Sequence, residues 1–157
     1  MADEGQKPPQ SASAISATSM PKPRVTAAER ILVIEDGSAV RRALKRLFES
    51  GGYSVDLAAD GISGLEILSK TMPSVVLLDL GLPDISGEEI YRAIIEIAPR
   101  VPIIVISAKT DLVERAALLD MGAYDYLTKP FSPRELLTRV GAALKEQRGS
   151  FLRETGS

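Results

Sequence analysis

The fold is decided by residues 75–84, which read Val-Val-Leu-Leu-Asp-Leu-Gly-Leu-Pro-Asp. Four consecutive apolar residues beginning with Val are too few for a buried helix, and they predict a strand covered on both faces, as in a parallel sheet. Asp79 ends this strand, and a carboxylate is costly to bury without a charged partner, a metal or solvent beside it. Because ligands bind at the carboxyl ends of strands in open α/β sheets, Asp79 is either a turn residue or part of a site.

Composition limits the chemistry that this chain can perform. Its 157 residues, 45% hydrophobic and 25% charged, suffice for one ordinary soluble domain. We expect a cytoplasmic protein without a membrane segment, because no apolar run could cross a bilayer and the N-terminus lacks a signal-peptide pattern. The absence of Cys and His excludes disulfides, thiolate nucleophiles, Ser-His triads and His-ligated metals. A net charge of −2 gives no general attraction to nucleic acid or anionic membrane.

Strands and helices are predicted to alternate along the chain after a flexible extension over residues 1–28, which is rich in Ser, Ala and Pro. Apolar runs predict strands over residues 31–34, 53–58, 75–78, 103–106 and 124–127. Helical periodicity follows each strand, and the last helix is expected to end near Arg148, before a polar tail over residues 149–157. Five strands alternating with five helices predict one α/β domain over residues 29–148 with a doubly wound parallel sheet.

Such a sheet brings five polar residues to one edge: Glu35, Asp36, Asp79, Ser107 and Lys129. Each alone is explained as a turn residue or a solvated charge. Together, three carboxylates repel one another unless a hard cation neutralises them, and oxygen ligands suit Mg²⁺. The Lys ammonium and the Ser hydroxyl offer donors to phosphoryl oxygens. The set predicts phosphoryl transfer onto a carboxylate.

At this point residues 30–148 resemble a known family, the receiver domains of bacterial two-component response regulators, nearest in pattern to winged-helix regulators. The resemblance is carried by Ile31 to Asp36, Leu78 to Asp84 with Gly87, Ile106 to Ala108, and Tyr124 to Phe131. It implies a flavodoxin-like sheet of five strands in the order 2-1-3-4-5.

The resemblance also implies roles at the acidic edge. Asp79 would be the phospho-acceptor, and Mg²⁺ would be held by Asp36, Asp79 and the backbone carbonyl of Gly81. Glu35 stands where the family more often has Asp, and it would act through a water bound to the metal. No organic cofactor is implied.

Three further residues match the family's switch. Ser107 stands at its Ser/Thr position and Lys129 at its invariant Lys, with a cis bond expected between Lys129 and Pro130. Tyr126 matches the aromatic switch position, although a Tyr in a strand is equally explained as half-buried packing.

The function that this resemblance implies is a phosphorylation-activated signalling switch. A sensor histidine kinase or phosphotransfer protein would phosphorylate Asp79, and the surface of the fourth helix, fifth strand and fifth helix would change. The only catalysis expected is phosphorylation of its own Asp and slow hydrolysis of the product. A Mg²⁺-dependent aspartyl-phosphate hydrolase is an alternative, but it needs a second Asp where Gly81 stands.

The downstream output stays open between a stand-alone receiver and a fragment of a DNA-binding transcriptional regulator without its effector domain. We expect no direct nucleic-acid binding by this domain. Four residues match charged positions that pair across the dimer of winged-helix regulators: Arg115, Asp125, Glu135 and Arg139. Exposed charges on helices are otherwise merely solvated.

Overall fold

The structure, a computed structural model, describes residues 29–108 and 112–156, so the extension expected over residues 1–28 lies outside the described residues. Within them, the strands are β2 (Arg30–Ile34), β3 (Ser54–Ala58), β4 (Val75–Asp79), β5 (Ile103–Ser107) and β6 (Asp125–Thr128). The helices are α2 (Ser38–Ser50), α3 (Gly61–Thr71), α4 (Gly87–Ile97), α5 (Leu112–Asp120) and α6 (Pro133–Gly156).

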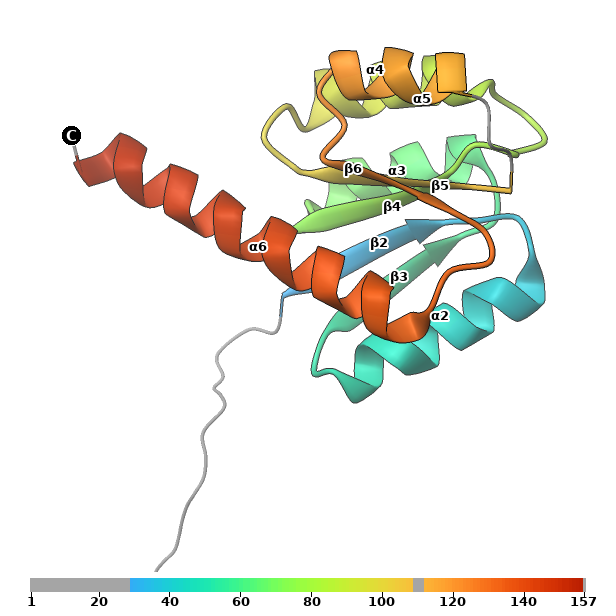
Figure 1. Cartoon of the computed structure of the whole chain (residues 1–157), viewed down its shortest axis with the longest axis horizontal. Coiled ribbons are helices and arrows are strands. Elements are labelled where there is room, and N and C mark those ends of the chain that lie inside the picture. Colours follow the sequence, from blue (N-terminus) through green and yellow to red (C-terminus); the bar gives the residue numbers. More distant parts are fainter. Residues whose placement is uncertain (1–28, 109–111, 157) are drawn as a thin grey trace, which may run out of the picture.

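All strand pairs are parallel, and the sheet order is β3-β2-β4-β5-β6. Counted along the chain, this is the order 2-1-3-4-5, so the expected doubly wound, flavodoxin-like fold is confirmed. Helices α3, α4 and α5 cover one face of the sheet, and α2 and α6 cover the other (Figure 1). Strand β4 is therefore central, with both faces and both edges covered.

The central strands divide their side chains between two cores. In β4, Val76 and Leu78 pack on the side of α3 and α4, whereas Val75 and Leu77 pack on the side of α2 and α6. All four side chains are fully buried. This period of two explains why the strand reads as an unbroken apolar run, since neither face meets water.

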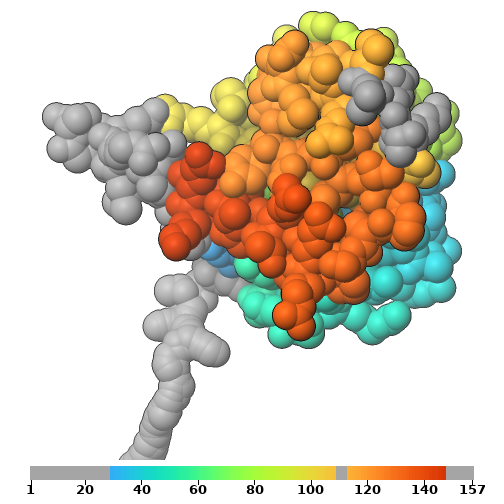
Figure 2. Space-filling view, viewed as in Figure 1, coloured from blue at the N-terminus to red at the C-terminus, as the bar shows by residue number. Residues whose placement is uncertain are grey.

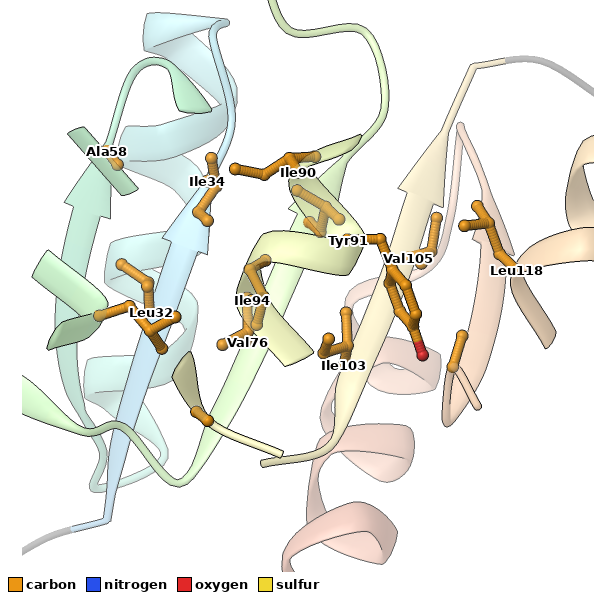
Figure 3. Close-up of a cluster of buried hydrophobic side chains, with 14 of the residues drawn as sticks. Leu32, Ile34, Ala58, Val76, Ile90, Tyr91, Ile94, Ile103, Val105 and Leu118 are labelled. Carbon is orange, nitrogen blue, oxygen red and sulfur yellow. The ribbon is translucent and has the colours of Figure 1, made fainter. Parts of the chain in front are cut away.

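Helix α4 provides the largest side chains of the first core. Ile90, Tyr91 and Ile94 lie on its inner face and are at most 1% exposed. Figure 3 shows them lying over the sheet toward Ile34, Val76 and Val105. Ser86 begins this helix by accepting a hydrogen bond from the Glu89 backbone N–H, and this cap lies just beyond the loop that follows Asp79.

The last helix differs from the expectation at its end. It continues to Gly156, beyond the end expected near Arg148. Residues 149–157 were expected as a polar tail, but a polar composition does not prevent a helix, and the one Gly at 149 costs only about 1 kcal/mol relative to Ala. No helix in the described part of the chain is long and apolar enough to cross a membrane.

Two glycines offer a matched test of this packing. A Cβ on Gly64 in α3 would lie 2.6 Å from Cδ1 of the fully buried Ile34, whereas a Cβ on Gly141 in α6 would meet no atom within 4 Å. We expect Gly64→Ala to lower the free energy of unfolding by about 1–3 kcal/mol through overpacking. Gly141→Ala should raise it by about 0.5–1 kcal/mol through helix propensity. Urea unfolding measures both, and equal effects would contradict the close approach at Gly64.

Candidate functional site

Four neighbouring strands end at the same edge of the sheet, and their ends carry the polar residues that the sequence singled out. Glu35 directly follows β2, Asp79 ends β4, Ser107 ends β5, and Lys129 directly follows β6. The Lys129 backbone N–H donates to the Ser107 carbonyl over 2.7 Å, which joins the last two strand ends. The expected convergence of these residues is therefore present, and the expected cis bond between Lys129 and Pro130 is also present.

Three carboxylates gather at this edge. Glu35, Asp36 and Asp79 each offer one oxygen, and these oxygens lie within 4.8 Å of one another. Glu35 is 1% exposed and Asp79 is 4% exposed, whereas Asp36 is open to solvent. If all three are ionised, Lys129, which pairs with Glu35 and Asp79 among the described residues, leaves two negative charges unbalanced. A divalent cation bound by oxygen ligands fits this charge and this donor set.

Lys129 pairs more closely with Glu35 than with Asp79. Its Nζ lies 2.9 Å from Glu35 Oε1 and 3.7 Å from Asp79 Oδ1. Burial acts to lower the pKa of Lys129, but the hydrogen bond to Glu35 and the nearby carboxylates outweigh it and raise that pKa. Lys129 therefore stays charged between the two buried acids.

The carboxylate of Glu35 makes a second contact within the chain. Its Oε2 accepts a hydrogen bond of 2.9 Å from the Gly37 backbone N–H, while Oε1 accepts from Lys129. Both oxygens are thus engaged, and the side chain is held between the start of α2 and the end of β6. The Arg41 guanidinium also donates to the Glu35 carbonyl over 2.8 Å. Sequence reasoning missed both contacts, because neither Gly37 nor Arg41 carries a local signal for them.

Asp79 is held in a state that disfavours its charge. Burial raises its pKa, and the negative charges of Glu35 and Asp36 raise it further. The hydrogen bond of 3.2 Å from the Gly81 N–H and the positive charge of Lys129 lower this pKa. The pKa of Asp79 is raised overall. The negative charge of an ionised Asp79 is therefore only partly balanced by its neighbours, which favours a positively charged partner.

The aromatic residue of the predicted switch lies one strand beyond Ser107. Tyr126 is 5% exposed, and its hydroxyl has no hydrogen-bond partner in the described part of the chain. The Arg115 guanidinium of α5 lies 5.7 Å from the centre of the Tyr126 ring, at cation–π distance. Tyr126 therefore packs as a core residue here, as the alternative interpretation expected.

The other charged residues singled out for a dimer are paired within one chain. Arg139 of α6 binds Asp125 at the start of β6, and its second terminal nitrogen lies 3.2 Å from Glu135 Oε2. Asp125 also accepts from the Tyr126 N–H. These residues thus fasten α6 to β6, which the sequence did not indicate.

A further acid, Asp84, lies in the loop after Asp79 and was read only as a turn residue. It accepts hydrogen bonds from the backbone N–H groups of Gly61 and Ile62, 23 and 22 residues earlier in the chain. A Leu-Pro-Asp turn carries no signal for such a distant contact.

Comparison with known proteins agrees with this geometry. Residues 31–141 match the family described as response regulator receiver domain. A protein named response regulator MprA from Mycobacterium sp. (strain KMS) is 43% identical over 116 residues, which cover 74% of this chain and 50% of that protein. The protein of the same name from Mycobacterium leprae (strain TN) is 42% identical over 116 residues, or 74% and 51% of the two chains. The chain therefore spans about half the length of the curated relatives it matches.

Solved structures share the fold. A CheY-like response regulator receiver domain protein from Methanospirillum hungatei JF-1 aligns with a TM-score of 0.76 and 30% identity, over 79% of this chain and 99% of that one. The receiver domain of sensor histidine kinase PA1611 from Pseudomonas aeruginosa PAO1 aligns with a TM-score of 0.69 and 32% identity, over 76% and 99%. That structure has a magnesium ion coordinated in its active site cleft.

The raised pKa of Asp79 predicts how its charge affects stability. The folded protein holds the Asp79 proton more tightly than the unfolded chain, so ionisation destabilises the fold at pH values above the folded pKa. This cost disappears as pH falls below the unfolded value of about 3.9. We expect Asp79→Asn to raise the urea midpoint of the metal-free protein at pH 7 and to lose this advantage in acid.

Glu66→Gln is the matched control, because Glu66 is an exposed carboxylate on α3 and its neutralisation should change stability little at either pH. An Asp79→Asn protein less stable than wild type at pH 7 would contradict the only partly balanced charge of Asp79.

Proposed function

The chain belongs to the response regulator receiver family, whose domains act in phosphorylation-dependent two-component signalling, and we propose that Asp79 is its phospho-acceptor. The observation that carries this proposal is the position of Asp79. It is a buried carboxylate at the end of the central strand, with the Lys129 ammonium 3.7 Å away. Ser107 ends the adjacent strand β5 and faces the same edge.

The transfer itself needs little covalent chemistry from the protein. An oxygen of ionised Asp79 attacks the phosphorus of the donor, and the bond between phosphorus and the donor group breaks. The electron pair of that bond leaves with the donor, and an acyl phosphate forms on Asp79. Lys129 then has a more negative partner than before, because a phosphoryl group carries nearly two charges. The Ser107 hydroxyl is the neighbouring neutral donor for a phosphoryl oxygen.

The unbalanced acidic edge supports a Mg²⁺ site. Asp36, Asp79 and the Gly81 carbonyl would hold the ion, and all three belong to segments that end or follow a central strand. When bound, Mg²⁺ neutralises charge on the equatorial phosphoryl oxygens. Glu35 contributes its charge to this site, and because both of its oxygens are engaged it also positions Lys129.

The proposed donor is a sensor histidine kinase or a phosphotransfer protein, and the exchange would take place in the cytoplasm. These 157 residues contain no His, so a phosphohistidine donor must lie outside them. A small phosphodonor can replace that protein in a test, because the acceptor chemistry belongs to this chain.

Phosphorylation should depend on Asp79 and on Mg²⁺. Incubated with acetyl phosphate and Mg²⁺, the wild-type protein should gain one phosphoryl group by intact mass, and Asp79→Asn should gain none. A chelator should abolish the gain in the wild type. The control is Asp120→Asn at the end of α5, for which an unchanged rate is expected. A wild-type rate in Asp79→Asn would overturn the assignment.

We also propose that the phosphorylated form dimerises through the face of α5, β6 and α6. Residues 113–147, orange to red in Figure 2, form one continuous surface on the side turned to the viewer. Since Arg139 is already paired with Asp125 and Glu135, the exposed Arg115 is the more informative residue to test.

Charge-reversal variants test whether this face forms the dimer. With beryllofluoride and Mg²⁺, we expect Arg115→Glu to raise the dimer dissociation constant about tenfold, which corresponds to roughly 1.4 kcal/mol. The control is Lys45→Glu, an exposed Lys on α2 outside the proposed face, with little change expected. Sedimentation equilibrium measures both. A wild type that stays monomeric when activated would discard the dimer and leave the phosphorylation proposal intact.

A further inference from the structure

The loop after Asp79 is tied to the start of a helix on the other side of the site. Asp84 Oδ1 accepts from the Gly61 N–H over 2.9 Å, and Asp84 Oδ2 accepts from the Ile62 N–H over 3.0 Å. These are the first two residues of α3, whose N–H groups have no partner inside the helix. One carboxylate thus satisfies two donors of an element that is distant in sequence.

The remaining donor of this helix end is satisfied differently. The Ser63 N–H donates to Asp60 Oδ1 over 2.8 Å, so Asp60 is a cap from the helix's own chain. Asp60 and Asp84 therefore serve the same helix end, but only Asp84 joins it to the loop. The two contacts can be removed separately.

Side-chain packing also joins the loop after Asp79 to the start of α3. A Cβ on Gly61 would lie 3.0 Å from Cδ1 of Ile85, the residue after Asp84, so the loop packs closely against the helix start. The two N–H donors also hold the pKa of Asp84 below its ordinary value, as expected for a carboxylate at a helix N-terminus. Hydrogen bonds and contact thus agree that the loop rests on α3.

The loop carries the backbone atom that the proposed metal site needs. Gly81 lies between Asp79 and Asp84 in sequence, and its N–H is already turned toward Asp79 Oδ1. On its strand side the loop is held by the Leu80 N–H, which donates to the Ile106 carbonyl. Asp84 holds the other side. The Gly81 carbonyl therefore lies in a segment fastened at both ends.

We propose that Asp84 is a positioning residue for the metal site, which acts by fastening the loop that carries the Gly81 carbonyl to α3. This inference rests on the proposed function, because it concerns the affinity of the same site for Mg²⁺. Groups that orient metal ligands without touching the metal typically change affinity by about 10–100-fold when removed. Asp84 is solvent-exposed and acts through the backbone, so we expect the lower end, about tenfold.

Direct titration tests the proposal without using activity. Mg²⁺ is added to the metal-free 157-residue chain, and amide chemical shifts of Gly81 and Asp36 are followed by NMR. Asp84→Ala should raise the dissociation constant about tenfold. Asp84→Asn should lie between Asp84→Ala and wild type, because its amide keeps one acceptor oxygen and loses the other. Asp60→Ala removes a cap of the same helix and should leave the constant unchanged.

A second readout separates positioning from chemistry. In acetyl phosphate reactions, the Mg²⁺ concentration that gives half the maximal rate should rise in Asp84→Ala, whereas the rate at saturating Mg²⁺ should match wild type. Thermal unfolding of each variant checks that it is folded, and if Asp84→Ala is not, Asp84→Asn carries the test.

Two results would overturn the inference. Asp84→Ala could bind Mg²⁺ as tightly as wild type, or Asp60→Ala could weaken binding as much as Asp84→Ala, which would assign the effect to the helix end. A wild-type chain that binds no Mg²⁺ would instead remove the proposed metal site, on which the inference depends.

Discussion

The concentration of negative charge at the carboxyl edge of the sheet is the constraint on which the rest of the structure depends. Two of the three acids there, Glu35 and Asp79, are almost fully buried, and Lys129 is the cation placed between them. Buried carboxylates without a partner would be too costly to retain. The fold meets this cost by bringing the end of β6 to the edge formed by β2 and β4, so the last strand is fixed by charge as well as by its core contacts. The remaining excess of negative charge, which is expressed in the raised pKa of Asp79, favours a cation at this edge.

Glu in place of Asp at residue 35 changes how this balance is reached. Its side chain is one methylene longer than that of Asp, and it contacts the Gly37 N–H with one oxygen and Lys129 with the other. Lys129 therefore lies nearer to Glu35 than to Asp79. If Asp79 is the phospho-acceptor, as proposed, its phosphoryl group would carry about twice the charge of a carboxylate and would compete with Glu35 for Lys129. The pair with Glu35 keeps the ammonium charged and close to Asp79.

The strands and the acidic edge could be predicted because their signals are local. An apolar run of four residues marks each inner strand, and the polar residue that follows it must lie at the strand end. Strand order came from family resemblance, since periodicity does not specify which strands pair. Two kinds of contact were missed. Asp84 reaches Gly61 across 23 positions, and no pattern within a window of sequence encodes a pair so far apart. Glu35 also contacts Gly37 and Arg41, which are close in the chain but carry no residue pattern that indicates these bonds. The end of α6 was missed for another reason, because the polar composition of residues 149–157 was taken as a tail, although polar residues are compatible with a helix.

Local sequence signals also failed to indicate the ion pairs on the face of α5, β6 and α6. Arg115, Asp125, Glu135 and Arg139 were selected as charges that could pair between two chains, but three of them already pair within one chain. An ion pair between chains at this face must therefore share or replace an existing partner, and its net gain is smaller than that of two unpaired charges. Arg115 differs, because its guanidinium lies at cation–π distance from the ring of Tyr126. A movement of Tyr126 would remove this contact. The Tyr126 hydroxyl has no hydrogen-bond partner in the described part of the chain, so the position of the ring is set by packing and by Arg115. This buried ring thus couples the packing of β6 to a charge on the surface of α5.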